Sequence, residues 1–295
     1  MITQILLIIL IIQIYIFYTY LNRHIDLWNN LDDYNTYKIP FHIKRRTDTA
    51  PRVISGVPLV IYQSWHINEV PKNMKNTINK LIRMNPEFDY YLYSDEASRD
   101  FIAKNYSEEV LGAFDSLKPG AFKSDLWRYC ILYKTGGVYL DIKYYSVYPI
   151  IEMIKKTPLI FVKDLPAACA TSSRPYGIYN AFMVSPPNHP IFINCINEIV
   201  ANTKMKIYGT CSLDITGPCL LSKMMINYDK YVNDKDKIYK NLKWNFSQFG
   251  SYFQTIWYNN ERAFVIYSKY RIEQKTFQKT EHYGKLWDEE NIYNV

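Results

Sequence analysis

Residues 120–147 read GAFKSDLWRYCILYKTGGVYLDIKYYSV, a pattern that predicts a helix, a glycine stop and a short strand. Gly136 and Gly137 predict a helix stop, because glycine tolerates the left-handed conformation found there. Residues 138–140 then form a short buried strand, and Asp141 stands at its carboxyl end. Ligands of open α/β sheets bind at that edge, so Asp141 marks a predicted site. The helix before the stop has one apolar stripe, made of Phe122, Leu126, Tyr129, Cys130 and Tyr133.

Two charged residues lie beside this stripe. Asp125 and Arg128 are three positions apart on the predicted helix and therefore share a face. Next to Asp141 they would form a polar site, with carboxylates for sugar hydroxyls and a guanidinium for phosphate. The spacing alone leaves an alternative open, in which Asp125 and Arg128 form a structural ion pair that ties the helix to the strand.

Strands and helices alternate on both sides of this stretch, which predicts an α/β domain with a parallel sheet. Strands are predicted over residues 57–62, 88–93 and 178–184, with further late strands within residues 244–272. Pro71 opens a helix that ends before Pro86, and Ser94 caps the next one. Two more helices are predicted over residues 190–203 and 218–228.

The N-terminal segment predicts a single-pass membrane anchor over residues 1–22. Residues 2–21 carry no charge, and about 20 apolar residues span a bilayer as a helix. A cleaved signal peptide fits less well, because neither a basic leader nor a small-residue cleavage site is present. Residues 23–56 are polar and predict a stem, and residues 57–295 predict the globular domain. The side of the membrane stays open.

Composition narrows the function classes. The chain has 295 residues, of which 48% are hydrophobic, and this excludes wholesale disorder. A net charge of +7, spread along the chain, suits a phosphate-bearing ligand or an anionic membrane but is too dilute to predict nucleic acid as a partner. Five cysteines without a CxxC pair argue against a zinc ribbon.

The pattern S-D-L-W-R-Y-x-I-L-Y-x-x-G-G-V-Y-L-D, together with four further blocks in order, resembles the DXD-containing sugar transferases of glycosyltransferase family 32. The further blocks are residues 57–65, residues 180–183 with 189–190, residues 216–218, and His282 with Trp287. The resemblance implies a Rossmann-like GT-A fold and a transfer that retains anomeric configuration. It also implies a UDP- or GDP-sugar as donor and a glycan or glycolipid as acceptor, which a membrane-anchored enzyme would serve.

The same resemblance implies roles for individual residues. Asp125, Arg128 and Asp141 would be catalytic: Asp125 binds sugar hydroxyls, Arg128 contacts sugar or diphosphate, and Asp141 is the first Asp of the DXD motif. Among the donor-binding residues, Asn180 would line the sugar pocket, and Gln63 and Trp65 would lie near the base. A divalent cation, Mn²⁺ or Mg²⁺, would be held by Asp141 and His282.

One departure from the family pattern affects this expectation. The motif reads Asp141-Ile142-Lys143, so a lysine replaces the second Asp, and a charged ammonium offers no lone pair to a cation. Lys143 can place its charge against the diphosphate, partly replacing the metal. Alternatively Asp141 still binds the metal with His282 or another acid. In a third case catalysis is lost, and the chain is a nucleotide- or sugar-binding module. We expect activity, because the other donor-site residues remain together.

Overall fold

The computed structural model describes Gln13 and residues 33–47, 51–166, 170–249, 253–278 and 280–294. Apart from Gln13, the predicted anchor lies outside these residues. Within the part of the chain that the structure describes, no helix is long and apolar enough to cross a membrane.

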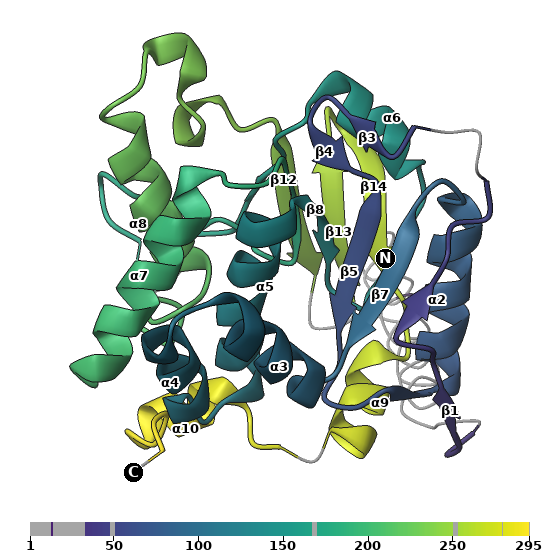
Figure 1. Cartoon of the computed structure of the whole chain (residues 1–295), viewed down its shortest axis with the longest axis horizontal. Helices are drawn as coiled ribbons and strands as arrows, with labels where there is room; N and C mark the ends of the chain where they lie inside the picture. The colour runs from purple at the N-terminus through teal and green to yellow at the C-terminus, as the bar shows by residue number, and fades with distance from the viewer. Residues whose placement is uncertain are drawn as a thin grey trace, which may run out of the picture.

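A five-stranded sheet forms the centre of the molecule (Figure 1). Its three inner strands are parallel, and an antiparallel strand flanks them on each side. The predicted parallel sheet is therefore mixed, because the strand expected within residues 178–184 returns antiparallel beside β8. The order across the sheet is β11 (Phe182–Ser185), β8 (Gly137–Leu140), β5 (Val60–Ser64), β7 (Asp89–Tyr93) and β2 (His42–Ile43).

Both faces of this sheet are covered, because successive side chains point to opposite sides. Tyr62 and Tyr139 pack against one group of helices, whereas Ile61 and Leu140 pack on the other side. The first group contains α3 (Asp95–Asn105), α4 (Glu108–Ser116), α5 (Gly120–Thr135), α7 (Pro190–Lys204) and α8 (Pro218–Asp229). The other side contains α2 (Lys72–Met84), α6 (Ile150–Lys156) and a second sheet.

The second sheet begins directly after the DXD-like turn. Its strand β9 (Tyr144–Ser146) pairs antiparallel with β14 (Glu261–Ile266), which comes from the C-terminal part of the chain. The late strands predicted within residues 244–272 are thus present, although a helix begins at Tyr270. The other strands are β10 (Val162–Lys163), β12 (Trp244–Phe249) and β13 (Phe253–Tyr258). Two short helices follow, α9 (Tyr270–Phe277) and α10 (Tyr283–Asp288).

Several local signals in the sequence are confirmed. Pro71 and Asn85 bound α2, and the Ser94 hydroxyl accepts a hydrogen bond from the Ala97 amide at the start of α3. Helix α5 ends at Gly136, whose φ of +64° lies in the left-handed region. These signals work because caps and stops depend on the local chain alone.

Part of the range predicted as a stem takes part in the sheets. Besides β2, strand β1 (Thr36–Lys38) pairs with β6 (Glu69–Pro71), and β3 (Val53–Ile54) pairs with β4 (Val57–Pro58). Their lengths of two or three residues are too short to leave a periodic pattern in a polar sequence.

Candidate functional site

A pocket of about 610 Å³ opens at the carboxyl edge of the three parallel strands. Ser64 and Trp65 line it at the end of β5, Asp95 after β7, and Asp141 after β8. The N-terminal half of α5 forms its floor, and residues of α9 and α10 complete the wall. The pocket therefore lies where parallel strands leave backbone and side chains open to a ligand.

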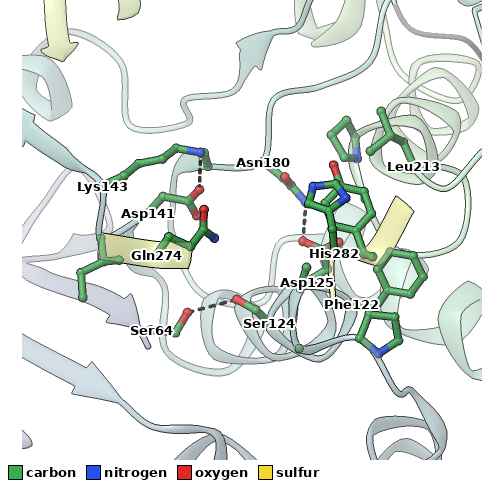
Figure 2. A pocket seen from close by; sticks show the side chains of 18 of the residues that line it. Ser64, Phe122, Ser124, Asp125, Asp141, Lys143, Asn180, Leu213, Gln274 and His282 are labelled. Atoms are coloured by element: carbon green, nitrogen blue, oxygen red, sulfur yellow. Dashed lines mark hydrogen bonds and ion pairs between the residues drawn. The ribbon is translucent and has the colours of Figure 1, made fainter. Parts of the chain in front are cut away.

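Asp125 is held on the α5 side of the pocket. Its carboxylate accepts a hydrogen bond from Asn180 Nδ2 at 2.9 Å (Figure 2). It accepts a second from the Thr216 hydroxyl at 2.8 Å. The residue is only 8% exposed, and burial raises the pKa of this carboxyl, although Arg128 opposes the shift. Two neutral donors thus fix the orientation of Asp125 towards the pocket that it lines.

Arg128 joins the two acidic residues. Its guanidinium lies 3.4 Å from Asp125 Oδ1 and 3.5 Å from Asp141 Oδ1, and its Cζ lies 4.4 Å from the centre of the Tyr139 ring. It also donates to the Asn180 carbonyl at 2.9 Å. The ion pair considered from spacing is therefore present and does tie α5 to the end of β8. The same guanidinium also lines the pocket.

Asp141 is surrounded by donors and cations. Its Oδ1 accepts from the Tyr139 hydroxyl at 2.8 Å, and its Oδ2 lies 3.0 Å from Lys143 Nζ. Burial would raise the pKa of this carboxyl, but the charges of Lys143 and Arg128 outweigh burial and hold the pKa below its ordinary value. Asp141 is accordingly an ionised carboxylate at neutral pH.

Lys143 follows Asp141 through a tight turn, in which the Tyr144 amide donates to the Asp141 carbonyl at 3.1 Å. The residue is 8% exposed and lines the pocket. Its Nζ lies 5.3 and 5.5 Å from the ring centres of Tyr144 and Tyr179. Burial lowers the pKa of the ammonium, and Asp141 partly restores it.

The other predicted donor-binding residues differ in their access to the pocket. Asn180 lines the pocket beside Asp125, and Trp65 also lines it but is only 5% exposed. Gln63 lies behind the pocket, fully buried, where its Nε2 donates to the Asp141 carbonyl at 3.2 Å and its Oε1 accepts from Tyr90. In this arrangement Gln63 supports Asp141.

His282 lines the same pocket but lies across it from Asp141. Its Nδ1 accepts from the Gly284 amide at 3.1 Å and so caps α10. Figure 2 places Lys143, Asp141 and Gln274 on one side of the hollow, and Asn180, Asp125 and His282 on the other. The structure thus brings His282 into the pocket without bringing it to Asp141.

This arrangement does not fit the divalent cation that the resemblance implies. Among the described residues, no three His, Cys, Asp or Glu side chains gather as a metal site. The two oxygens of Asp141 face a hydroxyl, a guanidinium and an ammonium, and the ammonium stands where the pattern has a second carboxylate. A divalent cation at Asp141 would be repelled by the charges of Lys143 and Arg128.

Several residues at the site were not predicted as site residues. Thr216 is fully buried and does not line the pocket, but it belongs to a block that carried the resemblance, and its bond to Asp125 gives that block a physical role. The Ser124 hydroxyl accepts a hydrogen bond from Arg128 Nη2 at 2.9 Å. Ser124 lies four residues before Arg128 on the predicted helix, so this contact could have been predicted from the sequence. Arg271 and Gln274 reach the pocket from α9, and nothing in their local sequence indicates it.

Asp164 is a further acidic residue in the pocket. Its carboxylate accepts from the Leu165 amide at 2.8 Å. Burial raises its pKa to about 6, with the Leu165 amide and Lys143 acting in the opposite direction. It follows the strand β10, which has only two residues and could not be predicted from the sequence.

Comparison with known proteins supports the sequence resemblance. Residues 71–160 match the family described as the glycosyltransferase sugar-binding region containing a DXD motif, and this range includes Asp125, Arg128 and Asp141. The resemblance to DXD-containing sugar transferases is therefore confirmed.

Fungal mannosyltransferases are among the curated relatives that match. Inositol phosphoceramide mannosyltransferase 2 of Schizosaccharomyces pombe is 28% identical over 240 residues, which cover 73% of this chain and 63% of that protein. The initiation-specific alpha-1,6-mannosyltransferase of Candida albicans is 29% identical over 112 residues, 36% of this chain and 29% of that protein. The chain thus spans less than two thirds of the length of these relatives.

A solved structure, the PaToxG glycosyltransferase, is also similar. It matches with a TM-score of 0.45 and 15% sequence identity, over 61% of this chain and 72% of that one.

Proposed function

Since residues 71–160 match the sugar-binding region of DXD-containing glycosyltransferases, we propose that this chain transfers a sugar from a nucleoside diphosphate sugar to a glycan or glycolipid. Mannose is the first sugar to test, because the relatives are named as mannosyltransferases. An inositol phosphoceramide is the first acceptor, on the same ground. An N-terminal membrane anchor and a GT-A fold are parts of this proposal.

One observation carries the proposal. Asp125, Arg128, Asp141 and Asn180 come from one helix and two adjacent strand ends or loops, yet they form one connected set of contacts of 2.9–3.5 Å at the wall of one pocket. A purely structural ion pair would need no pocket of this volume beside it. Small-molecule sites are concave and contain a few convergent polar groups of this kind.

The chain's own groups suit sugar transfer from a nucleoside diphosphate. Asp125 and Asn180 offer acceptors and a donor to sugar hydroxyls, while Arg128 and Lys143 offer N–H groups to phosphate oxygens. Stabilising the charge that develops on the departing diphosphate is the main electrostatic task of such a reaction. The released diphosphate takes up the proton of the acceptor hydroxyl.

A donor screen tests the proposal directly. The full chain in detergent is incubated with GDP-mannose and a panel of UDP- and GDP-sugars, and release of the nucleoside diphosphate is measured with and without inositol phosphoceramide. We expect turnover of one donor, stimulated by acceptor, and a fall of about 100-fold or more in the Asp141→Asn variant, because one charged partner of Lys143 and Arg128 is lost.

The rival function is a non-catalytic nucleotide- or sugar-binding module, which Lys143 at the second DXD position favours. It predicts that a nucleotide binds, as measured by calorimetry, while no donor in the panel is turned over under any metal condition. It also predicts unchanged behaviour of Asp141→Asn. That combination of results would replace the transferase proposal.

A further inference from the structure

Lys143 places a cation of the protein itself beside the first Asp of the DXD-like motif. Lys143 Nζ lies 3.0 Å from Asp141 Oδ2, inside the distance of a direct ion pair. The carbonyl of Lys143 accepts from the Tyr267 amide at 3.1 Å, so its backbone is fastened to the segment that leads into α9. The ammonium is thereby held at a defined place in the pocket wall.

The surroundings of Lys143 keep its charge effective. The residue is 8% exposed, and the rings of Tyr144 and Tyr179 lie near its ammonium, so water screens the charge only weakly. The electron-rich face of an aromatic ring also tolerates a cation. A fixed, poorly screened cation is what a departing diphosphate requires.

Lys143 does not act alone at this end of the pocket. Arg128 pairs with the same Asp141, and Arg271 from α9 lines the pocket close enough to lower the pKa of Lys143 by charge repulsion. Lys143 and Arg128 therefore share the ionised carboxylate of Asp141, and Arg271 adds a third cation to the same pocket. These cations attract an anion such as a diphosphate and repel a divalent metal ion.

We propose that Lys143, with Arg128 and Arg271, binds the diphosphate of the donor in place of a divalent cation, so that sugar transfer by this chain is independent of metal. This inference rests on the proposed function. In the step, the bond between the anomeric carbon and the β-phosphate oxygen breaks, and its electron pair stays on that oxygen, which accepts hydrogen bonds from the ammonium. The acceptor hydroxyl oxygen bonds to the anomeric carbon, and its proton passes to the diphosphate.

The first experiment measures donor turnover by the full chain in EDTA and in MnCl₂. We expect the wild-type rates to agree within about twofold. Lys143→Met should lose about 100-fold or more in both conditions. Lys143→Asp places a second carboxylate two residues after Asp141, and its turnover in MnCl₂ should exceed that in EDTA by tenfold or more. The matched control is Lys155→Met, since Lys155 is an exposed lysine on α6 paired with Glu152, and it should behave as wild type.

Folding and function are kept apart by further measurements. Asp141 keeps Arg128 and Tyr139 as partners when Lys143 is replaced, so the variants should fold. Should Lys143→Met fail to fold, Lys143→Arg retains the charge and should stay active in EDTA. The inference is overturned if wild-type turnover requires MnCl₂, or if folded Lys143→Met keeps wild-type turnover.

A binding measurement decides the matter without turnover. Calorimetry with GDP and UDP in EDTA should give a Kd for the wild type that MnCl₂ leaves unchanged and that Lys143→Met raises tenfold or more. If no donor is turned over but this pattern holds, the transferase proposal fails and the diphosphate clamp stands. If binding of the nucleotide appears only with MnCl₂, or is equal in Lys143→Met, the clamp is refuted.

Discussion

Asp164 provides a residue-scale prediction, because its pKa of about 6 lies above the ordinary value of 3.8 for an aspartate. A carboxyl whose folded pKa is raised contributes stability that is fully present below the unfolded pKa and is lost as the pH rises through the folded pKa. The wild type should therefore lose this contribution between about pH 4 and pH 7.

Replacing Asp164 with asparagine removes the titrating group. The Tm of Asp164→Asn, measured relative to wild type at each pH, should rise steadily from about pH 4 to pH 7 and then level off. Thermal melts followed by circular dichroism at half-unit pH steps would show this. A constant Tm difference across the range would mean that Asp164 is not strained by burial.

The sequence predicts which residues form the site better than it predicts their individual contacts. The spacing of Asp125 and Arg128, and the position of Asp141 after a buried strand, were sufficient to predict that these three residues lie together. The ion pair of 3.0 Å between Lys143 and Asp141 follows from a turn in the structure. The positions of Thr216 beside Asp125 and of Arg271 at the pocket could not be predicted, because they depend on the packing of segments far away in the chain.

The connection between α5 and β8 supports a prediction at the scale of elements. Gly136 has a φ of +64° and a ψ of −164°, a region that only glycine occupies readily. A Cβ at this position would lie 2.6 Å from the backbone nitrogen of Pro187, which cannot move aside as a flexible side chain could. The turn therefore needs glycine for two independent reasons.

Gly136→Ala should reduce the free energy of unfolding by about 3 kcal/mol. Chemical denaturation of the variant would measure this. Gly112 provides the control, since it is exposed within α4 and a Cβ there would meet no atom within 4 Å. Gly112→Ala should be neutral or stabilising by about 0.5–1 kcal/mol, because alanine favours helix. Equal effects of the two substitutions would contradict the account of the turn.

Helices and strands were predicted well where a local sequence signal sets their bounds. They were predicted poorly where their presence or direction depends on pairing with another strand. Helices α2, α3, α5, α7 and α8 were expected near their observed bounds from caps, stops and apolar stripes. The antiparallel direction of β11 was missed, because side-chain periodicity is the same in either direction. The short strands β1 to β3 were missed because a run of two or three residues is too short to show a period.

At the scale of the whole molecule, Glu273 joins α9 to the start of α2, which lies 200 positions earlier in the chain. This fully buried residue on α9 accepts hydrogen bonds from Asn73 N and Nδ2, from Met74 N and from the Tyr267 hydroxyl. Two of these donors are amides at the start of α2, where a negative charge is favourable. The contact fixes α9, and with it Arg271 and Gln274, against the pocket.

Glu273→Ala leaves four donors without this acceptor and should destabilise the protein by about 3 kcal/mol. Hydrogen exchange followed by mass spectrometry should show faster exchange in α9 than in α5, and donor turnover should fall with it. Glu152→Ala, which removes an exposed surface ion pair with Lys155, should cost less than about 1 kcal/mol. Unchanged exchange in α9 of Glu273→Ala would show that other contacts hold this helix.

Helix α9 is synthesised late, so the pocket is completed only near the end of translation of this sequence. More than a hundred positions separate Lys143 from Arg271, and at about 5–20 residues per second the ribosome needs roughly 6–26 s to add them. During that interval the nascent chain contains Asp125 and Asp141 but lacks the part of the pocket wall that Arg271 and Gln274 form. A premature stop codon before residue 270 would leave the same open half-site. The residues from 270 onward therefore decide when the complete pocket first exists.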